Sequence, residues 1–308
     1  MALNGRVERL DGIREVSEGI GATPIRSGCM AQHRRRRSQG RHSPDGLRLL
    51  AVLAHPDDES LGLGGVLARY AAEGVETFVL TATRGERGRF YDDSTRPSEA
   101  EVGRVREGEL RAAARELGVA EVSLLDYRDG DLDRADPVEA VGRIVQHVRR
   151  IRPQVVLTFA PDGAYGHPDH IAISYLTTTA LLVAADAAHA PGSPHRVTKL
   201  YYMAWPPRVW ELYQRVFKKL VSVVDGVERQ ATPWPEWMLT TRIDARAHWQ
   251  TVWRAVGRHE TQLAIYGRLH ELTPEQHQML WGEQHFCRIL STVNGGRQVE
   301  QDLFAGLR

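Results

Sequence analysis

The sequence has few cysteines and no long apolar run. Its 308 residues include two cysteines, Cys29 and Cys287, and neither belongs to a CxxC pair. Two cysteines are too few for a disulfide framework or a thiolate zinc site, so a reducing, cytoplasmic location is expected. No apolar stretch approaches the roughly 18 residues that a membrane-spanning helix needs, and no continuous apolar segment follows the first basic residues. The sequence therefore does not indicate export or membrane insertion.

A surplus of charge of one sign is also lacking. The 40 Lys and Arg residues against 39 Asp and Glu leave a formal charge of +1, so no global field attracts nucleic acid or an anionic membrane. Residues 1–46 are rich in Gly, Ser and Arg and contain the run Arg34–Arg37. We expect a flexible basic extension there and no nucleic-acid partner, because no aromatic side chain accompanies the basic run.

From residue 47 the sequence alternates predicted strands and helices. Apolar runs, which are typical of buried parallel strands, occur at 47–54, 76–83, 121–125 and 155–159. Amphipathic segments with capping signals predict helices at 60–73, between Ser98 and Gly118, from Asp136 to about 148, and at 171–187. This alternation predicts an α/β fold with a Rossmann-like, doubly wound, mostly parallel sheet and helices on both faces.

The pattern weakens in the last third of the chain. Residues 47–195 are expected to form the catalytic core, and 196–308 to complete the sheet and cover the site as a smaller α/β cap. A strand at 197–203 and a helix at 245–263 are predicted there, and the tryptophans of this region are expected to pack over the core. In the first predicted helix, Gly62, Gly64 and Gly65 do not form a phosphate-binding GxGxxG loop, so we expect them to allow close packing of helix against sheet.

The residues suited to chemistry form two clusters, each directly after a predicted strand. The first is Ala54-His55-Pro56-Asp57-Asp58-Glu59, and the second is Tyr165-Gly166-His167-Pro168-Asp169-His170. Because ligands bind at the carboxyl ends of strands in open α/β sheets, the clusters are predicted to meet at one sheet edge. Turn formation or helix capping explains either cluster alone equally well. Two His/Asp clusters after core strands favour a metal site.

Imidazole and carboxylate groups are ligands that zinc accepts, and a catalytic zinc takes three protein ligands and leaves one position open for water. His55, Asp58 and His170 are the predicted ligands. The same donors suit Fe(II) or another divalent ion, so the sequence does not fix the metal. Asp57, next to a ligand but directed differently, is the predicted general base that takes a proton from the attacking water.

A metal that activates water and polarises a carbonyl makes the hydrolysis of an amide feasible. This reaction builds an oxyanion and releases an amine, so it requires hydrogen-bond and proton donors near the metal. His167 is predicted to serve there. Asp169 is predicted to accept a hydrogen bond from His167, to fix its tautomer and to raise its pKa, and Tyr165 to donate a further hydrogen bond. The remaining histidines, among them His259, are expected to have surface or packing roles.

Both clusters resemble the motifs of the PIG-L/LmbE-like family of zinc-dependent N-acetylglucosamine deacetylases. That family includes mycothiol- and bacillithiol-pathway deacetylases and mycothiol conjugate amidases. The resemblance covers about residues 47–190, including Arg106–Leu110 and Tyr127–Gly130. It implies a Rossmann-like sheet and the same ligands, base and proton-transfer pair as above. It also implies sugar contacts from Arg106 and Asp129, although Arg106 on its predicted helix is equally well an ordinary surface residue.

The expected function is hydrolysis of the 2-acetamido group of a small N-acylated amino sugar, which releases acetate and an amine. Two alternatives stay open among enzymes: an amidase for a larger thiol-sugar conjugate, and a deacetylase for an antibiotic glycoside. A non-catalytic sugar- or metal-binding protein is the alternative from another class. Binding alone would not require Asp57 and His167, which disfavours it. Homo-oligomerisation is left open.

Overall fold

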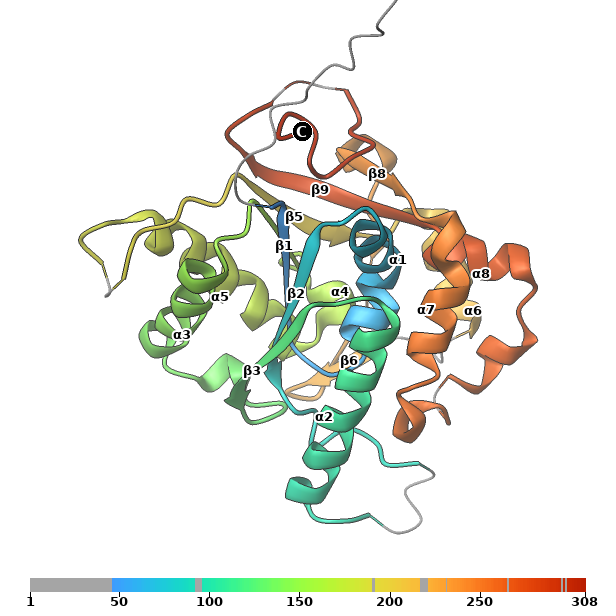
Figure 1. The fold of residues 1–308 in the computed structure, drawn as a ribbon. Helices are drawn as coiled ribbons and strands as arrows, with labels where there is room; N and C mark the ends of the chain where they lie inside the picture. Colours follow the sequence, from blue (N-terminus) through green and yellow to red (C-terminus); the bar gives the residue numbers. More distant parts are fainter. Residues whose placement is uncertain are drawn as a thin grey trace, which may run out of the picture. The chain divides into compact units, whose positions relative to one another are not determined.

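A seven-stranded sheet runs through the centre of the protein (Figure 1). The computed structural model describes residues 46–91, 96–189, 192–216, 221–230, 232–264, 266–294, 296 and 298–308. The predicted basic extension, apart from Gly46, lies outside these residues. The strands of the sheet are β1 (Arg48–Leu53), β2 (Glu76–Thr83), β3 (Glu121–Tyr127), β4 (Val155–Thr158), β5 (Lys199–Ala204), β8 (Thr241–Asp244) and β9 (Glu283–Ser291).

The strand order is β3-β2-β1-β4-β5-β9-β8, in which the first five strands are parallel and the last two antiparallel to their neighbours. The chain moves outward from β1 to β3 and then crosses to β4 on the other side of β1. This reversal is a topological switch point, where ligands of such sheets bind. The prediction of a doubly wound, mostly parallel α/β fold is confirmed.

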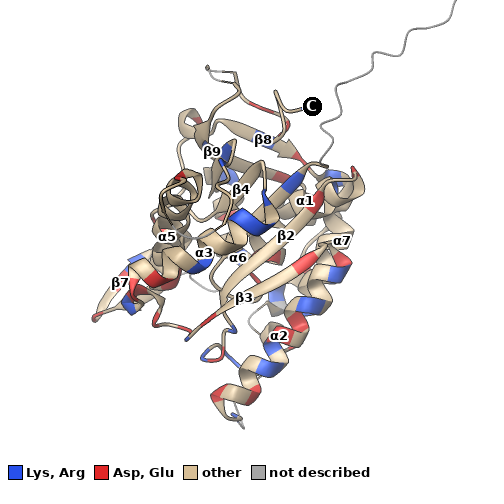
Figure 2. Ribbon diagram, turned by 60° about the vertical axis from the view of Figure 1, so that its left-hand side comes forward, with Lys and Arg blue, Asp and Glu red and all other residues tan. Residues whose placement is uncertain are grey.

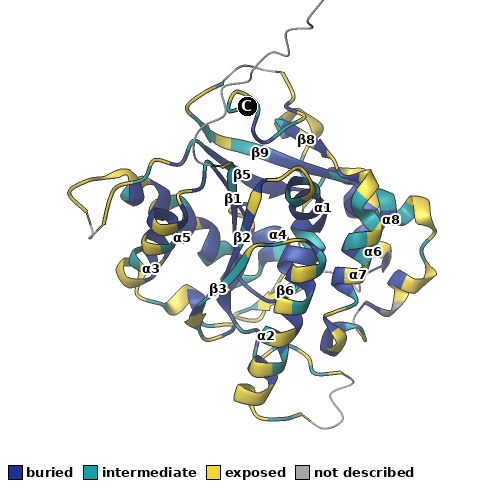
Figure 3. Ribbon diagram, viewed as in Figure 1, coloured by how far each residue is buried: buried dark blue, intermediate teal, exposed yellow. Residues whose placement is uncertain are grey.

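Helices cover both faces of the sheet. In Figure 1, α3 (Pro137–Ile151) and α5 (Pro168–Ala185) lie on one face, and α1 (Asp58–Ala72), α2 (Glu99–Glu116) and α7 (Trp249–Val256) lie on the other. The predicted caps are present: the Ser98 side chain accepts the Glu101 N–H, and Asp136 accepts two N–H groups of α3. Figure 3 shows the central strands of the sheet, β1, β4 and β5, buried between these layers. Figure 2 shows acidic and basic residues interspersed along α2, in line with the near-zero net charge.

The last third of the chain contains elements that the sequence did not predict. They are α6 (Pro207–Val216), α8 (Pro274–Trp281), the strands β8 and β9, and a separate hairpin of β6 (Val221–Val224) and β7 (Val227–Gln230). The predicted helix at 245–263 is wrong in length. Only Trp249–Val256 is α-helical, and after Gly257 the chain turns so that His259 is fully buried against Glu59. No helix among the described residues is long and apolar enough to cross a bilayer.

The glycines of α1 pack mainly against the last third of the chain. A Cβ on Gly64 would lie 2.8 Å from Val252 of α7, and one on Gly65 would lie 2.4 Å from the carbonyl oxygen of Trp281 in α8. Gly62 faces Met203 of β5, and a Cβ on Gly65 would also lie 3.0 Å from the Gln284 side chain of β9. The expectation of close packing is therefore right. Gly62 packs against the sheet as expected, Gly65 packs against both α8 and the sheet, and Gly64 packs against α7 instead. Helices α7 and α8 are thus fixed directly on the helix that begins at the first motif.

We expect Gly65→Ala to lower the free energy of unfolding by about 1–3 kcal/mol, because the new methyl group meets backbone that cannot move aside. The matched control is Gly108→Ala in α2, where nothing lies within 4 Å. That change should stabilise the protein by roughly 0.5–1 kcal/mol through helix propensity. Thermal or urea unfolding of both variants measures the difference. Equal stability of the two variants would show that the close packing at Gly65 is dispensable.

Candidate active site

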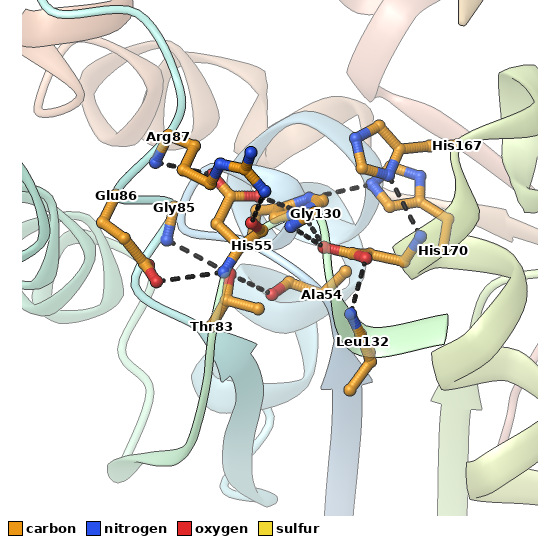
Figure 4. Close-up of polar contacts among 12 residues, drawn as sticks. Ala54, His55, Thr83, Gly85, Glu86, Arg87, Gly130, Leu132, His167 and His170 are labelled. Carbon is orange, nitrogen blue, oxygen red and sulfur yellow. Dashed lines mark hydrogen bonds and ion pairs between the residues drawn. The ribbon is translucent and has the colours of Figure 1, made fainter. Parts of the chain in front are cut away.

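The two motifs lie side by side at the carboxyl ends of β1 and β4. These strands are paired in parallel with Leu49 opposite Val155 and Ala51 opposite Leu157, so both end at the same sheet edge. His55 follows β1 and is held there because Thr83, at the end of β2, donates its backbone N–H and its hydroxyl to the carbonyl oxygen of Ala54. After β4 the chain forms the short turn α4 (Gly163–Gly166) and then α5. Figure 4 shows His167 and His170 beside His55.

The two ring nitrogens of His55 face different partners. Nε2 lies 3.1 Å from Asp169 Oδ2 and 3.2 Å from Asp129 Oδ1, so we assign its proton to a hydrogen bond with these carboxylates. Burial lowers the pKa of His55, but these hydrogen bonds outweigh it and raise the pKa well above its ordinary value. The carboxylates therefore stabilise positive charge at this ring. Nδ1 points the other way, toward His170 at 3.1 Å.

His170 presents a lone pair to the same point. Its Nδ1 donates to the carbonyl oxygen of Gly163 at 3.2 Å, which leaves Nε2 as the acceptor nitrogen that faces His55. Phe159 stacks on the ring with centroids 3.9 Å apart and fixes its plane. Burial, together with the charges of the neighbouring histidines, lowers the pKa of His170 well below its usual value. The ring is therefore neutral, the form in which imidazole binds a metal.

Asp58 supplies the negative charge at this point. Its Oδ2 accepts the backbone N–H groups of Ala54 and His55 and lies 3.8 Å from His55 Nδ1, while Oδ1 lies 3.5 Å from His170 Nε2. Burial raises the pKa of this carboxyl group, which is unfavourable for the anion without a nearby cation.

The donor set formed by His55, Asp58 and His170 fits a divalent cation. His55 Nδ1 and His170 Nε2 lie 3.1 Å apart beside a buried carboxylate, an arrangement that favours positive charge between them, either a proton on His55 or a cation in its place. Two nitrogens bound to one tetrahedral zinc at 2.0–2.1 Å would be separated by roughly 3.3 Å. Two sets that do not contain Asp58 have ligand atoms that all lie within 4.8 Å of one another: His55, His167 and His170, and His55, Asp129 and Asp169. Asp58 approaches His55 through Oδ2 and His170 through Oδ1. We favour Asp58, because His55 Nε2 is already engaged by the carboxylates and His167 Nδ1 accepts a backbone N–H.

Asp169 lies behind His55 and does not bond to His167 through its carboxylate. Besides His55, the fully buried carboxylate accepts the backbone N–H groups of Gly130 at 2.7 Å and Leu132 at 3.1 Å. The predicted carboxylate contact with His167 is therefore wrong. The backbone N–H of Asp169 instead donates to His167 Nδ1 at 3.2 Å, so a neutral His167 carries its proton on Nε2.

The sequence predicted a raised pKa for His167. In the structure the pKa is lowered. Burial and the charge of His55 lower it more than Asp169 raises it. His167 is therefore a neutral hydrogen-bond donor. The hydroxyl of Tyr165 also stays protonated, because burial raises its pKa. Both side chains line the cavity above the ligand set.

Asp57 has an unusual backbone conformation for a non-glycine residue, with φ of 106°. Its N–H donates to Glu59 Oε2 at 3.0 Å, and its carboxylate Oδ2 accepts from Arg106 at 3.1 Å and from the Tyr266 hydroxyl at 2.7 Å. Its other oxygen, Oδ1, has no protein donor in the described part of the chain. The carboxylate lines the cavity with this oxygen unused, as a general base requires.

Arg106 and Asp129 are both committed to protein contacts. Arg106 is 3% exposed, so the alternative of an ordinary surface residue is wrong. It donates to the carbonyl oxygens of Gly85 at 2.7 Å and Pro56 at 2.6 Å, as well as to Asp57. Asp129 accepts the N–H of Arg87 in addition to its contact with His55. Both residues line the cavity, but their polar atoms chiefly hold Asp57 and His55 in place.

Residues from the last third of the chain complete the site, and the sequence did not reveal them. Tyr266 contacts Asp57 across 209 residues, and the buried pair of His259 and Glu59, at 2.8 Å, supports the carboxylate that holds the Asp57 N–H. Thr261 anchors this segment through two 2.7 Å hydrogen bonds to Glu109. The segment 259–266 has no local pattern that marks it, because its partners are distant in sequence. His259 was expected to pack, and its buried position agrees with that.

The ligand set and Asp57 open into a cavity of about 290 Å³. Eight of the nine predicted site residues line it, and Asp169 lies behind it. The cavity thus brings together a cation site, a carboxylate with an unused oxygen, and neutral donors from His167 and Tyr165. This combination suits metal-assisted hydrolysis of an amide.

Comparison with known proteins agrees with this arrangement. A family profile described as "PIG-L: GlcNAc-PI de-N-acetylase" matches residues 50–181. A curated relative from Streptomyces avermitilis, named 1D-myo-inositol 2-acetamido-2-deoxy-alpha-D-glucopyranoside deacetylase, is 36% identical over 293 residues, which cover 84% of this chain and 97% of the relative. The chain belongs to the PIG-L family. The predictions of the family and of a deacetylase-type amide hydrolase are confirmed.

Solved structures show how widely the PIG-L fold is used. The N,N'-diacetylchitobiose deacetylase of Pyrococcus horikoshii matches with a TM-score of 0.61 at 19% identity, over 80% of this chain and 85% of that one. The 4-carboxy-2-hydroxymuconate hydratase of Pseudomonas putida KT2440 matches equally well, with a TM-score of 0.61 at 21% identity over 81% and 99%. At these identities the likeness shows the fold alone, so the side chains of the site must decide the chemistry.

We expect Asp169→Asn to weaken metal binding by about 10- to 100-fold, because the change removes the charge that fixes the His55 proton on Nε2. Competition with a chelator measures the affinity without reference to activity. The control is Asp133→Asn on the exposed surface nearby. Unchanged affinity in Asp169→Asn, with the protein folded, would exclude this role.

Proposed function

We propose that this chain is a zinc-dependent deacetylase that hydrolyses the 2-acetamido group of a small N-acetylglucosaminyl compound. The observation that carries the proposal is the convergence of His55, Asp58 and His170 beside the unused oxygen of Asp57. The names of the relatives support an N-acetylated amino sugar as substrate. Both zinc and Fe(II) bind imidazole and carboxylate ligands. We propose zinc because it undergoes no redox chemistry, which hydrolysis does not need. Cytoplasmic location stays a prediction, and homo-oligomerisation stays open.

Within this proposal, His55, Asp58 and His170 hold the cation, which when bound polarises the amide carbonyl and lowers the pKa of water. Oδ1 of Asp57 accepts the proton of the attacking water, while Arg106 and Tyr266 keep Oδ2 in place. Nε2–H of His167 and the hydroxyl of Tyr165 donate hydrogen bonds to the oxygen as it gains charge. The proton that Asp57 takes from the water must finally reach the departing amine, and we assign that transfer to the protonated Asp57, because a neutral His167 has no acidic proton to give.

Asp57→Asn should retain the metal and lose roughly 10²- to 10⁴-fold in kcat, the usual contribution of a general base. Amine release from methyl N-acetylglucosaminide by the zinc-loaded protein, with elemental analysis of the same sample, tests both parts. Full activity in the variant would refute the assignment of Asp57. A metal-loaded wild type that releases no amine from any N-acylated amino sugar would refute the proposed function.

Tyr266→Phe should lower kcat by about 10-fold and leave KM and metal content nearly unchanged. It removes one of two hydrogen bonds that orient a charged carboxylate, and such bonds contribute about 1.5–3 kcal/mol. The matched control is Tyr70→Phe, which removes a 2.9 Å tyrosine–aspartate hydrogen bond to Asp302 outside the cavity. If both variants lose kcat equally, the effect is on stability and Tyr266 does not position the base.

A further inference from the structure

The cavity has two chemically different sides. The side next to β2 and β3 is largely polar and is formed by Gly88, Arg89, Arg106, Asp129 and Gln262. The side next to β5 is aromatic, with Trp205 directly after that strand and Trp210 and Tyr213 on α6. Since β1 and β4 stand between β2 and β5 in the sheet, the ligand set after β1 and β4 lies between the two sides.

The aromatic side, formed by Trp205, Trp210 and Tyr213, is a fixed wall. The rings of Trp205 and Tyr213 meet edge to face with centroids 6.3 Å apart. The Tyr213 hydroxyl donates to the carbonyl oxygen of Leu61 at 2.6 Å, which turns this polar atom toward α1. Tyr213 is 6% exposed and Trp210 9% exposed. The wall is therefore packed in place and offers chiefly carbon surface to the cavity.

The aromatic wall begins next to the catalytic groups. Leu61 and Gly62, which also line the cavity, lie in the first turn of α1 directly after Asp58. The proposed ligand set and the wall therefore line the same cavity. A substrate whose amide lies at the ligand set must extend one of its substituents along this surface.

A polar substituent would be poorly accommodated on this side. Sugar hydroxyls placed against the rings would lose water without gaining equivalent partners, whereas an apolar group would be removed from water at little cost. We propose that the aromatic wall binds an apolar substituent of the substrate, an inference that rests on the proposed function. The preferred substrate is therefore an amphipathic amino-sugar amide, with its sugar toward the polar side.

Two positions on such a substrate could carry the apolar group: the acyl chain and the aglycone. Two series of glucosamine derivatives distinguish them. The first keeps a methyl aglycone and varies the acyl group from acetyl to hexanoyl and phenylacetyl. The second keeps the acetyl group and varies the aglycone from methyl to octyl. In the series that varies the substituent bound by the wall, we expect kcat/KM to rise by about 10-fold or more above the value for the acetylated methyl glycoside.

Variants of the wall connect the preference to these residues. In Trp205→Gln, the ratio of kcat/KM between the preferred apolar substrate and the methyl glycoside should fall to within about 3-fold of unity. Trp210→Gln provides an independent second variant if the first does not fold. The control is Trp237→Gln, where the side chain is 83% exposed and outside the cavity, and the ratio should stay as in the wild type. Quenching of tryptophan fluorescence by the preferred substrate analogue gives a readout independent of turnover.

The outcomes separate this inference from the proposed function. If the acetylated methyl glycoside is hydrolysed but neither apolar series is preferred, the inference is overturned and the proposed function stands. The inference also fails if Trp205→Gln and Trp210→Gln leave the ratio unchanged. If no compound of either series is hydrolysed by the metal-loaded protein, the proposed function itself fails.

Discussion

The site depends on two imidazole nitrogens that face each other in a buried position. His55 Nδ1 and His170 Nε2 are 3.1 Å apart, with the Asp58 carboxylate beside them. When both rings are neutral, neither can turn its proton toward the other, because the opposite nitrogen of each donates elsewhere: His55 to two carboxylates, and His170 to the carbonyl of Gly163. The surrounding groups thus favour positive charge at one point, which a second proton on His55 supplies without a metal and which a divalent cation would supply in its place.

The base is held by a different set of contacts. Asp57 keeps a backbone conformation that costs free energy on its own, so neighbouring groups must maintain it. Arg106 from α2, Glu59 from α1 and Tyr266 from the last third of the chain provide these contacts. Because α7 and α8 also pack on the glycines of α1, the last third is as much a part of the site as the motifs. Because the proposed metal ligands and Asp57 are held by separate contacts, a substitution can alter one of them without altering the other.

The sequence predicted what local patterns encode and missed what depends on distant partners. Parallel strands before His55 and before the second cluster, together with the caps Ser98 and Asp136, follow from periodicity and side-chain chemistry over a few residues. The contacts of Asp169 with His55, and of Tyr266 with Asp57, join residues 114 and 209 positions apart. Asp169 was assigned to its near neighbour His167, since sequence proximity was the only available guide. The strands β8 and β9 were missed because they join the sheet by antiparallel pairing with residues far away in the sequence, as Thr241 with Phe286 and Ala204 with His285.

The fold alone does not explain why this chain should hydrolyse an amide, since a hydratase has the same architecture. What distinguishes a hydrolytic site is the order of groups around the cavity. In the proposed mechanism, His55, Asp58 and His170 would hold a cation that polarises the carbonyl, Asp57 would take the proton of the water through its unused oxygen, and His167 and Tyr165 would donate hydrogen bonds to the oxyanion. The outer walls then select among amides. In our proposal, the polar groups beside β2 and β3 bind one substituent of the amide, and the aromatic rings beside β5 bind the other. The reaction and the substrate specificity would then depend on different strands of the same sheet.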